Sequence, residues 1–173
     1  MSLQGCIDGV FGKSNSEKHS STLKHCFFHL RSIDMPQVDF YILKNGEPNA
    51  ADLVACRLVE KAFSQKHAVY LHVADHAHAQ RLHDLLWTFK DTSFIPHGLC
   101  QSASSEMKIQ IGYGEPPTER DLLINLAPDV PVFFNTFTRI LEIIPKSSPF
   151  VEQGRERFRF YKAQNCELNT HTI

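Results

Sequence analysis

The stretch AVYLHVADHAHAQRLHDLLWTF, residues 68–89, predicts the class of fold to which the chain belongs. Its first part, AVYLHVA (68–74), is almost entirely apolar, which is typical of a strand covered on both faces. The part that follows, residues 76–89, has the spacing of an amphipathic helix, whose inner face consists of Leu82, Leu85, Leu86 and Phe89. A buried strand followed directly by such a helix is the building unit of a parallel α/β sheet.

The same alternation of strands and helices extends to both sides of this stretch. Upstream, VDFYIL (38–43) predicts a strand and residues 50–66 predict a helix with one apolar face. Downstream, the pattern predicts strands at 108–113, 121–126 and 139–144, a short helix at 133–138, and a helix over 149–164 that ends the chain. We therefore expect a single-domain, three-layer α/β/α protein with an open, mostly parallel, Rossmann-like sheet and helices on both faces.

The N-terminal part of the chain has a different composition. Gly, Ser, Lys and His dominate up to His25, so we expect residues 1–36 to be a poorly ordered extension and residues 37–173 to form the α/β domain. The piece GVFGKS (9–14) resembles the end of a P-loop, GxxxxGK(S/T). The first glycine of that motif would stand five positions before Gly12, but this position is Ile7, so the piece does not predict a phosphate site. Met35 stands just before the first strand and is an alternative start of the functional chain.

Composition excludes several classes of protein. The 173 residues carry a net charge of −1, which argues against a dedicated DNA-binding domain. No apolar run approaches the roughly 20 residues that span a bilayer, so we expect no membrane anchor. The five cysteines are odd in number, widely spaced and never in a CxxC pair, which favours reduced thiols in the cytoplasm over a disulfide framework or a zinc ribbon.

The sequence does not predict a cofactor, a metal or a catalytic centre. The loop after the first strand, KNGEPNA (44–50), has one glycine instead of GxGxxG, so the sheet lacks the phosphate-binding glycine loop. The best metal candidate is a group of histidines with one carboxylate, namely His72, Asp75, His76, His78 and His83. Because the histidines within the helix are not spaced as i, i+4 and no HExxH is present, solvated surface histidines are the simpler interpretation.

The stretch GRERFRFYKAQ (154–164) combines cations and aromatic residues. On a helix, Arg155, Phe158, Arg159 and Lys162 share one face, whereas Arg157 points elsewhere. Cations around one exposed aromatic ring predict a compact anion site with an apolar floor, suited to a peptide end with carboxylates and one hydrophobic side chain. A solvated helix whose basic end favours its own dipole is the alternative.

A second group of aromatic residues surrounds the end of the helix over 76–89. Trp87, Phe94 and Pro96 lie in a polar setting, where they are either part of the core or anchors for a protein partner. We assign Phe89 to the core.

Four stretches together resemble the chi subunit of bacterial DNA polymerase III. They are VDFYIL (38–43), RLHDLLWTFKDTSFIPHGL (81–99), RDLLINL (120–126) and IIPKSSPFVEQGRERFRFYKAQNCELNTHT (143–172). The resemblance covers about residues 36–173 in order, and residues 1–34 have no counterpart in the family.

The resemblance implies a non-catalytic accessory subunit of the replicase. It implies binding to the psi subunit through Trp87, Phe94 and Pro96, and through psi an indirect link to the clamp loader. It also implies binding to the acidic C-terminal tail of single-stranded DNA-binding protein through Ile144, Arg155, Phe158, Arg159, Lys162 and Thr170. Direct DNA binding would be weak or absent, and the family allows a helicase to compete for the Trp87 surface.

Two residues depart from the family pattern, and one alternative function stays open. Phe158 stands where a tyrosine is usual, and Arg159 replaces a lysine. The alternative is a small nucleotide-binding or metal-dependent enzyme on the same sheet. Such an enzyme should have a deep, polar pocket at the carboxyl ends of the strands, where we expect a chi subunit to be featureless.

Overall fold

The computed structural model describes residues 35–44, 49–90, 94–100, 107–114, 116 and 120–173. The predicted N-terminal extension, including GVFGKS, lies outside the described residues except for its last two positions, so its predicted lack of order stays a prediction. Most of the KNGEPNA loop also lies outside them.

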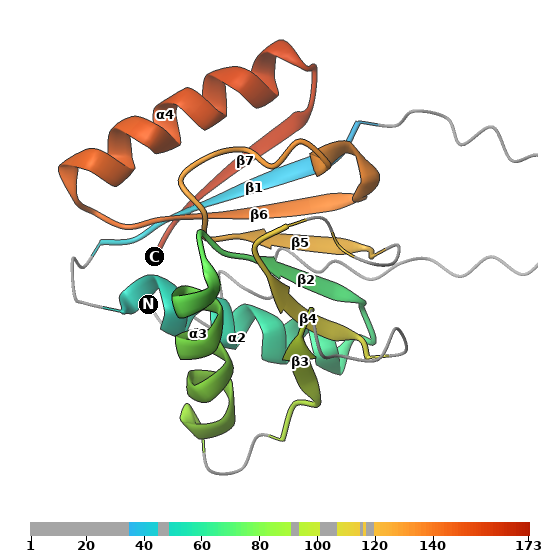
Figure 1. The fold of residues 1–173 in the computed structure, drawn as a ribbon. Helices are drawn as coiled ribbons and strands as arrows, with labels where there is room; N and C mark the ends of the chain where they lie inside the picture. The colour runs from blue at the N-terminus through green and yellow to red at the C-terminus, as the bar shows by residue number, and fades with distance from the viewer. Residues whose placement is uncertain (1–34, 45–48, 91–93, 101–106, 115, 117–119) are drawn as a thin grey trace, which may run out of the picture.

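The described chain forms one seven-stranded sheet in the order β3-β4-β2-β5-β6-β1-β7 (Figure 1). The strands are β1 (Gln37–Ile42), β2 (Val69–His72), β3 (His97–Leu99), β4 (Ile109–Gly112), β5 (Leu122–Asn125), β6 (Arg139–Ile144) and β7 (Glu167–Thr172). Each pairing between these strands is parallel, which confirms the predicted open α/β sheet.

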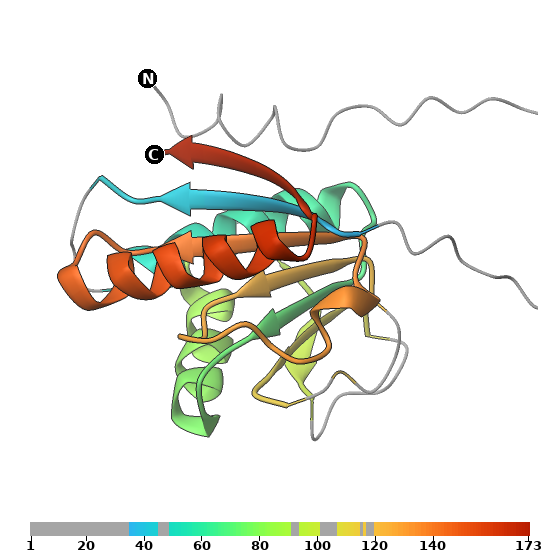
Figure 2. The ribbon, with the colours of Figure 1, turned by 90° about the horizontal axis from the view of Figure 1, so that it is seen from above.

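Helices cover both faces of the sheet (Figures 1 and 2). Helices α2 (Ala50–Ser64) and α3 (His76–Thr88) pack on one face, and α4 (Ser148–Ala163) packs on the other, near the 3-10 turn η1 (Phe134–Thr136). Each face has its own apolar core, one around Leu58, Leu71 and Leu82 and the other around Phe40 and Tyr161. The three-layer prediction is therefore confirmed. No helix among the described residues is long and apolar enough to cross a bilayer.

The two strands at the edges of the sheet were not predicted, and the expectation that the chain ends in a helix is wrong. After α4 the chain forms β7, which pairs with β1 along its whole length. Its sequence, ELNTHT, is polar because an edge strand is only partly covered. It is held by Leu168, which packs on the core, and by His171, whose Nε2 lies 3.2 Å from Oδ1 of Asp39. The other edge strand, β3, has only three residues.

Candidate functional site

A groove lies where α4 crosses the ends of β1, β6 and β7. We call it the α4 groove; its volume is about 310 Å³, and it is lined by Phe40, Ile42, Ile144, Val151, Gly154, Arg155, Phe158 and Thr170. The structure thus brings together four residues that the resemblance assigned to tail binding, namely Ile144, Arg155, Phe158 and Thr170. They come from three separate elements, two of them neighbours of β1 in the sheet.

The floor of the α4 groove is apolar. The rings of Phe40 and Phe158 lie 5.3 Å apart between centroids, and Phe158 is half-buried, so one side of its ring is available to a ligand. Gly154 keeps the groove open where α4 approaches β6. A Cβ atom at this position would lie 2.9 Å from Cδ1 and 3.1 Å from Cγ2 of Ile144.

The cations are distributed along α4 rather than gathered around the groove. Arg155 lines the groove, whereas Arg159 and Lys162 lie further toward the C-terminus of the helix and do not line it. All three side chains are exposed, and within the described part of the chain none of them has an ion-pair partner. The α4 groove therefore has one basic residue at its wall and a basic helix surface beyond it.

Arg157 belongs to the interior, which the prediction that it points away from the face of Arg155 and Arg159 did not specify. Its side chain is 6% exposed, its Nε lies 2.9 Å from Oε2 of Glu142, and its Nη1 donates to the carbonyl of Pro128. Glu142 also accepts hydrogen bonds from Asn125 and from the Tyr161 hydroxyl, the latter at 2.8 Å. Burial raises the pKa of Glu142, and the charge of Arg157 opposes that rise. The helical wheel correctly predicted that Arg157 points to another side of α4 than Arg155 and Arg159. It did not predict that this side of the helix packs against the sheet.

Trp87 and Phe94 form an exposed pair, which together with the exposed Pro96, two residues after Phe94, we call the Trp87 patch. Phe94 is 71% exposed and Trp87 is 45% exposed, and their rings lie 5.3 Å apart. Trp87 also rests on His97, whose ring nitrogens bond to the carbonyls of Ile95 and His83. Trp87 is thus held in place by the buried His97, and the outer side of the patch is exposed to solvent. Phe89 packs against the core, as expected.

The histidines of the metal candidate face different surroundings. His78 lies 2.9 Å from Asp52, His83 contacts Trp87, and His76 lies edge-on to Tyr113. His72 is largely enclosed near Phe133, and its burial lowers its pKa to about 4. Across the described ranges, no three His, Cys, Asp or Glu side chains are placed to hold a metal ion.

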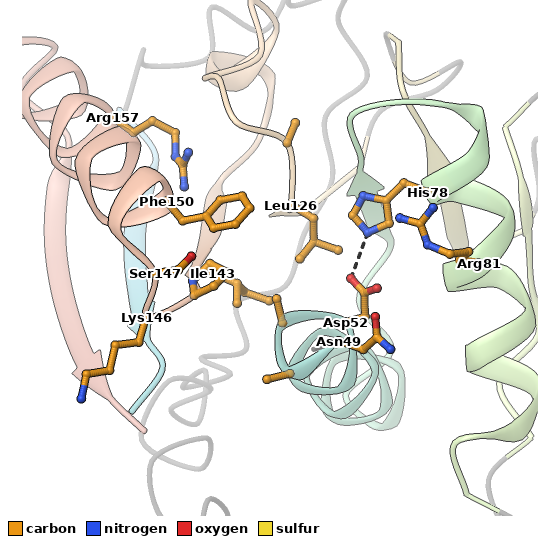
Figure 3. Close-up of a pocket in the computed structure, with 14 residues that line it drawn as sticks. Asn49, Asp52, His78, Arg81, Leu126, Ile143, Lys146, Ser147, Phe150 and Arg157 are labelled. Carbon is orange, nitrogen blue, oxygen red and sulfur yellow. Dashed lines mark hydrogen bonds and ion pairs between the residues drawn. The ribbon is translucent and has the colours of Figure 1, made fainter. Parts of the chain in front are cut away.

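A second cavity lies at the carboxyl ends of β5 and β6, so the expectation of a featureless edge is wrong (Figure 3). This carboxyl-edge cavity also has a volume of about 310 Å³. Its lining includes polar residues from four segments of the chain, among them Asp52, His78, Arg81, Ser147 and Arg157. Sequence reasoning missed it because no two of these segments share a motif; only the position of the edge in a parallel sheet could have indicated it.

Comparison with known proteins gives one consistent result. The family model described as DNA polymerase III chi subunit, HolC, matches residues 35–169. A protein of Pseudomonas aeruginosa named DNA polymerase III subunit chi is 41% identical over 140 residues, which cover 80% of this chain and 98% of the relative. Proteins of the same name from Haemophilus influenzae and Escherichia coli are 30% and 26% identical, over 78% and 80% of this chain and 95% and 99% of theirs.

A solved structure also shares the fold. The crystal structure of T4 UvsW superimposes with a TM-score of 0.54 at 10% identity, over 82% of this chain and 42% of that one. At this identity the likeness concerns the architecture of the sheet and its helices alone.

Proposed function

The chain belongs to the DNA polymerase III chi subunit family, and we propose that it tethers the replicase to DNA coated by single-stranded DNA-binding protein. The proposal has two parts. The α4 groove binds the acidic C-terminal tail of single-stranded DNA-binding protein, and the Trp87 patch binds the psi subunit, which links the chain to the clamp loader.

The observation that carries the first part is the combination of an apolar floor with a basic wall. A tail that ends in Pro-Phe presents one aromatic side chain next to a free carboxylate. The floor around Phe40, Ile144 and Phe158 is suited to the ring, and Arg155 is placed to pair with the carboxylate. Such charge-assisted hydrogen bonds contribute about 1.5–3 kcal/mol each.

The basic surface beyond the groove has a separate role. Acidic residues that precede the Pro-Phe end would lie along α4, where Arg159 and Lys162 are exposed without ion-pair partners in the described chain. These contacts are solvent-exposed, so they contribute mainly a general electrostatic attraction, which weakens as the salt concentration rises. They contribute little to specificity. Arg159 stands where a lysine is usual in the family. Its planar guanidinium can donate two parallel hydrogen bonds to one carboxylate, which an ammonium group cannot do.

The Trp87 patch supports the second part. Large exposed aromatic side chains that are held rigidly are typical anchors of protein interfaces, and Trp87 and Phe94 contact each other at the surface. A helicase that competes with psi would use the same patch.

Tethering explains how a subunit without catalysis contributes to replication. Several tails on each coating protein tetramer would raise the effective concentration of the replicase at single-stranded DNA. The subunit would then act in the cytoplasm, where the replicase copies the chromosome, with no metal or cofactor of its own and little direct contact with DNA.

A titration tests the tail-binding part. A fluorescently labelled acidic peptide ending in Pro-Phe should bind saturably to the full chain, and Arg155→Ala should weaken its binding about tenfold or more. The matched control is Arg57→Ala, which removes an exposed arginine from α2 on the opposite face of the sheet. Equal losses in both variants would indicate diffuse charge attraction. Labelled single-stranded DNA should then bind as well as the peptide does, and the proposal would fail.

A further inference from the structure

We propose that the carboxyl-edge cavity binds a mononucleotide, with its phosphate between the N-termini of α2 and α4 and its base on Phe150. This is a second site, distinct from the α4 groove. The two lie on different sides of α4, because Gly154, Arg155 and Phe158 line the groove, whereas Ser147, Phe150 and Arg157 line the cavity.

The position of the cavity is the first argument. In an open parallel sheet, the strand ends and the helix N-termini meet at the carboxyl edge, where small ligands bind. Here Leu126 and Ala127 follow β5 directly, Ile143 is at the end of β6, and Ala50 begins α2. The apolar residues form the inner wall of the cavity, and polar groups surround them.

Two helix N-termini at the cavity have no side-chain cap. Asn49 precedes α2 and Ser147 precedes α4, and both residue types commonly cap helices, yet neither side chain does so here. By contrast, α3 is capped by Asp75, which accepts a hydrogen bond from the His78 backbone at 2.7 Å. Among the described residues, the first-turn N–H groups of α2 and those of Ser148 and Phe150 in α4 thus have no side-chain partner and are available to an anion, whereas Pro149 has no N–H to offer. The helix dipoles also favour an anion at these positions.

The cationic side chains are the second, independent argument for an anion. Arg81 lines the cavity from α3 and, among the described residues, has no ion-pair partner; Lys146 lies at the rim, and Figure 3 shows its side chain extending away from the cavity. Arg157 is fixed at the opposite wall by Glu142, and Figure 3 shows its guanidinium beside the Phe150 side chain. A buried ion pair of this kind contributes little net stability, but it holds the guanidinium in one orientation.

Among the described residues, Asp52 is the one acidic residue that lines the cavity, and it is paired with His78 at 2.9 Å. The pair limits repulsion of a phosphate by the carboxylate, because the imidazole bonds to it. The second carboxylate oxygen can accept a hydrogen bond from a sugar hydroxyl.

Phe150 and the size of the cavity define the rest of the ligand. Phe150 is 46% exposed, and in Figure 3 its ring points into the cavity, as expected of a platform for a flat base. The volume of about 310 Å³ suits a mononucleotide, and it is at the low end of the range for small-molecule sites. A bare phosphate would leave the apolar wall and Phe150 without a partner.

Isothermal titration of the full chain with AMP, ribose 5-phosphate, adenosine and inorganic phosphate tests the proposal. AMP should bind saturably with a Kd of about 1 mM or tighter, and about tenfold or more tightly than each of the other three probes. Arg81→Ala should weaken AMP binding about tenfold. Phe150→Ala should reduce AMP binding to the level of ribose 5-phosphate, and the control Arg57→Ala should leave it unchanged.

Three outcomes would overturn the proposal: no saturable binding of AMP at millimolar concentrations, equal binding of AMP and inorganic phosphate, or an Arg81→Ala variant that binds AMP as the parent chain does. The peptide titration of the α4 groove uses other residues. The failure of one proposal is therefore distinguishable from the failure of the other.

Discussion

Gly154 is a single residue on which the shape of the α4 groove depends. In a helix interior, alanine is more favourable than glycine by about 1 kcal/mol, but here its Cβ would press against Ile144, and overpacking costs about 1–3 kcal/mol. We expect Gly154→Ala to lower the free energy of unfolding by about 1 kcal/mol and to weaken tail-peptide binding. Urea unfolding and the peptide titration measure the two effects. Glu152→Ala, on the exposed side of α4, is the control, and a Gly154→Ala chain more stable than the parent would contradict the expectation.

Arg157 tests whether the buried polar cluster supports the fold. Replacing it by alanine leaves Glu142 fully buried without its ion-pair partner, so we expect Arg157→Ala to destabilise the protein by about 3–5 kcal/mol. Arg159→Ala, two residues further along and exposed, should change stability by no more than about 0.5 kcal/mol. Chemical denaturation distinguishes the two variants. Similar stabilities would mean that the Glu142 cluster tolerates an unpaired carboxyl group.

His72 makes stability depend on pH. Burial lowers its pKa from 6.5 to about 4, and its Nδ1 has no hydrogen-bond partner among the described residues. Because the unfolded chain binds the proton more readily, this contribution to stability is complete above pH 6.5 and is lost as the pH falls toward 4. Since the ring is not fully enclosed, we expect a loss on the order of 2 kcal/mol.

The variant His72→Phe keeps the aromatic packing against Phe133 and cannot titrate. Its thermal stability should decline less than that of the parent chain between pH 6.5 and pH 4.5. The exposed His76→Gln variant should keep the parent profile. A His72→Phe profile that coincides with the parent profile would rule out His72 as the source.

Different sides of helix α4 contact different parts of the protein. Arg155 and Phe158 face the groove, and Arg157 and Tyr161 face the sheet. If Arg155 pairs with the terminal carboxylate of the tail, Arg155→Ala and amidation of the peptide C-terminus remove the same contact. Each change should cost about 1.5–3 kcal/mol of binding free energy. When the Arg155→Ala variant is titrated with the amidated peptide, the loss should be clearly smaller than the sum of the two separate losses. A double-mutant cycle by fluorescence anisotropy measures this coupling. Full additivity would assign the carboxylate to another residue.

The elements also show which parts of the fold are readable from sequence. The run at 68–74 predicted β2 because a strand buried on both faces is apolar throughout, and the leucine spacing after it predicted α3. By contrast, β7 is an edge strand whose residues are only partly covered, so its sequence is polar, and β3 consists of only three residues, His97–Leu99, which are too few for an apolar pattern. The groove was predicted in part, because Arg155 and Phe158 share a helix face. Its strand residues Phe40 and Ile42 were not predicted, since their places depend on how β1 pairs with β6 and β7.

At the scale of the whole molecule, the two proposed protein-binding surfaces lie at opposite edges of the sheet. The Trp87 patch rests on β3 through His97, and the α4 groove includes Thr170 of β7. At a strand spacing of about 4.8 Å, β3 lies roughly 29 Å from β7 and roughly 19 Å from β6, the strand of the groove that is nearest to it. Both distances exceed the Debye length of about 8 Å at physiological ionic strength, so charges at one surface act weakly on the other.

This separation predicts that psi and the tail of single-stranded DNA-binding protein bind together and independently. Saturating the chain with psi should change the Kd of the tail peptide by less than about twofold. Phe94→Ala should weaken psi binding by about 2 kcal/mol or more and leave peptide binding unchanged, whereas Arg155→Ala should have the reverse effect. In the double variant, the loss of psi binding and the loss of peptide binding should each equal that of the corresponding single variant to within about 0.5 kcal/mol. Competition between psi and the peptide, or a coupling free energy above about 1 kcal/mol, would mean that the surfaces overlap or that the sheet transmits a change between them. Independent binding is what a tether requires, because the chain must hold the clamp loader and coated DNA at the same time.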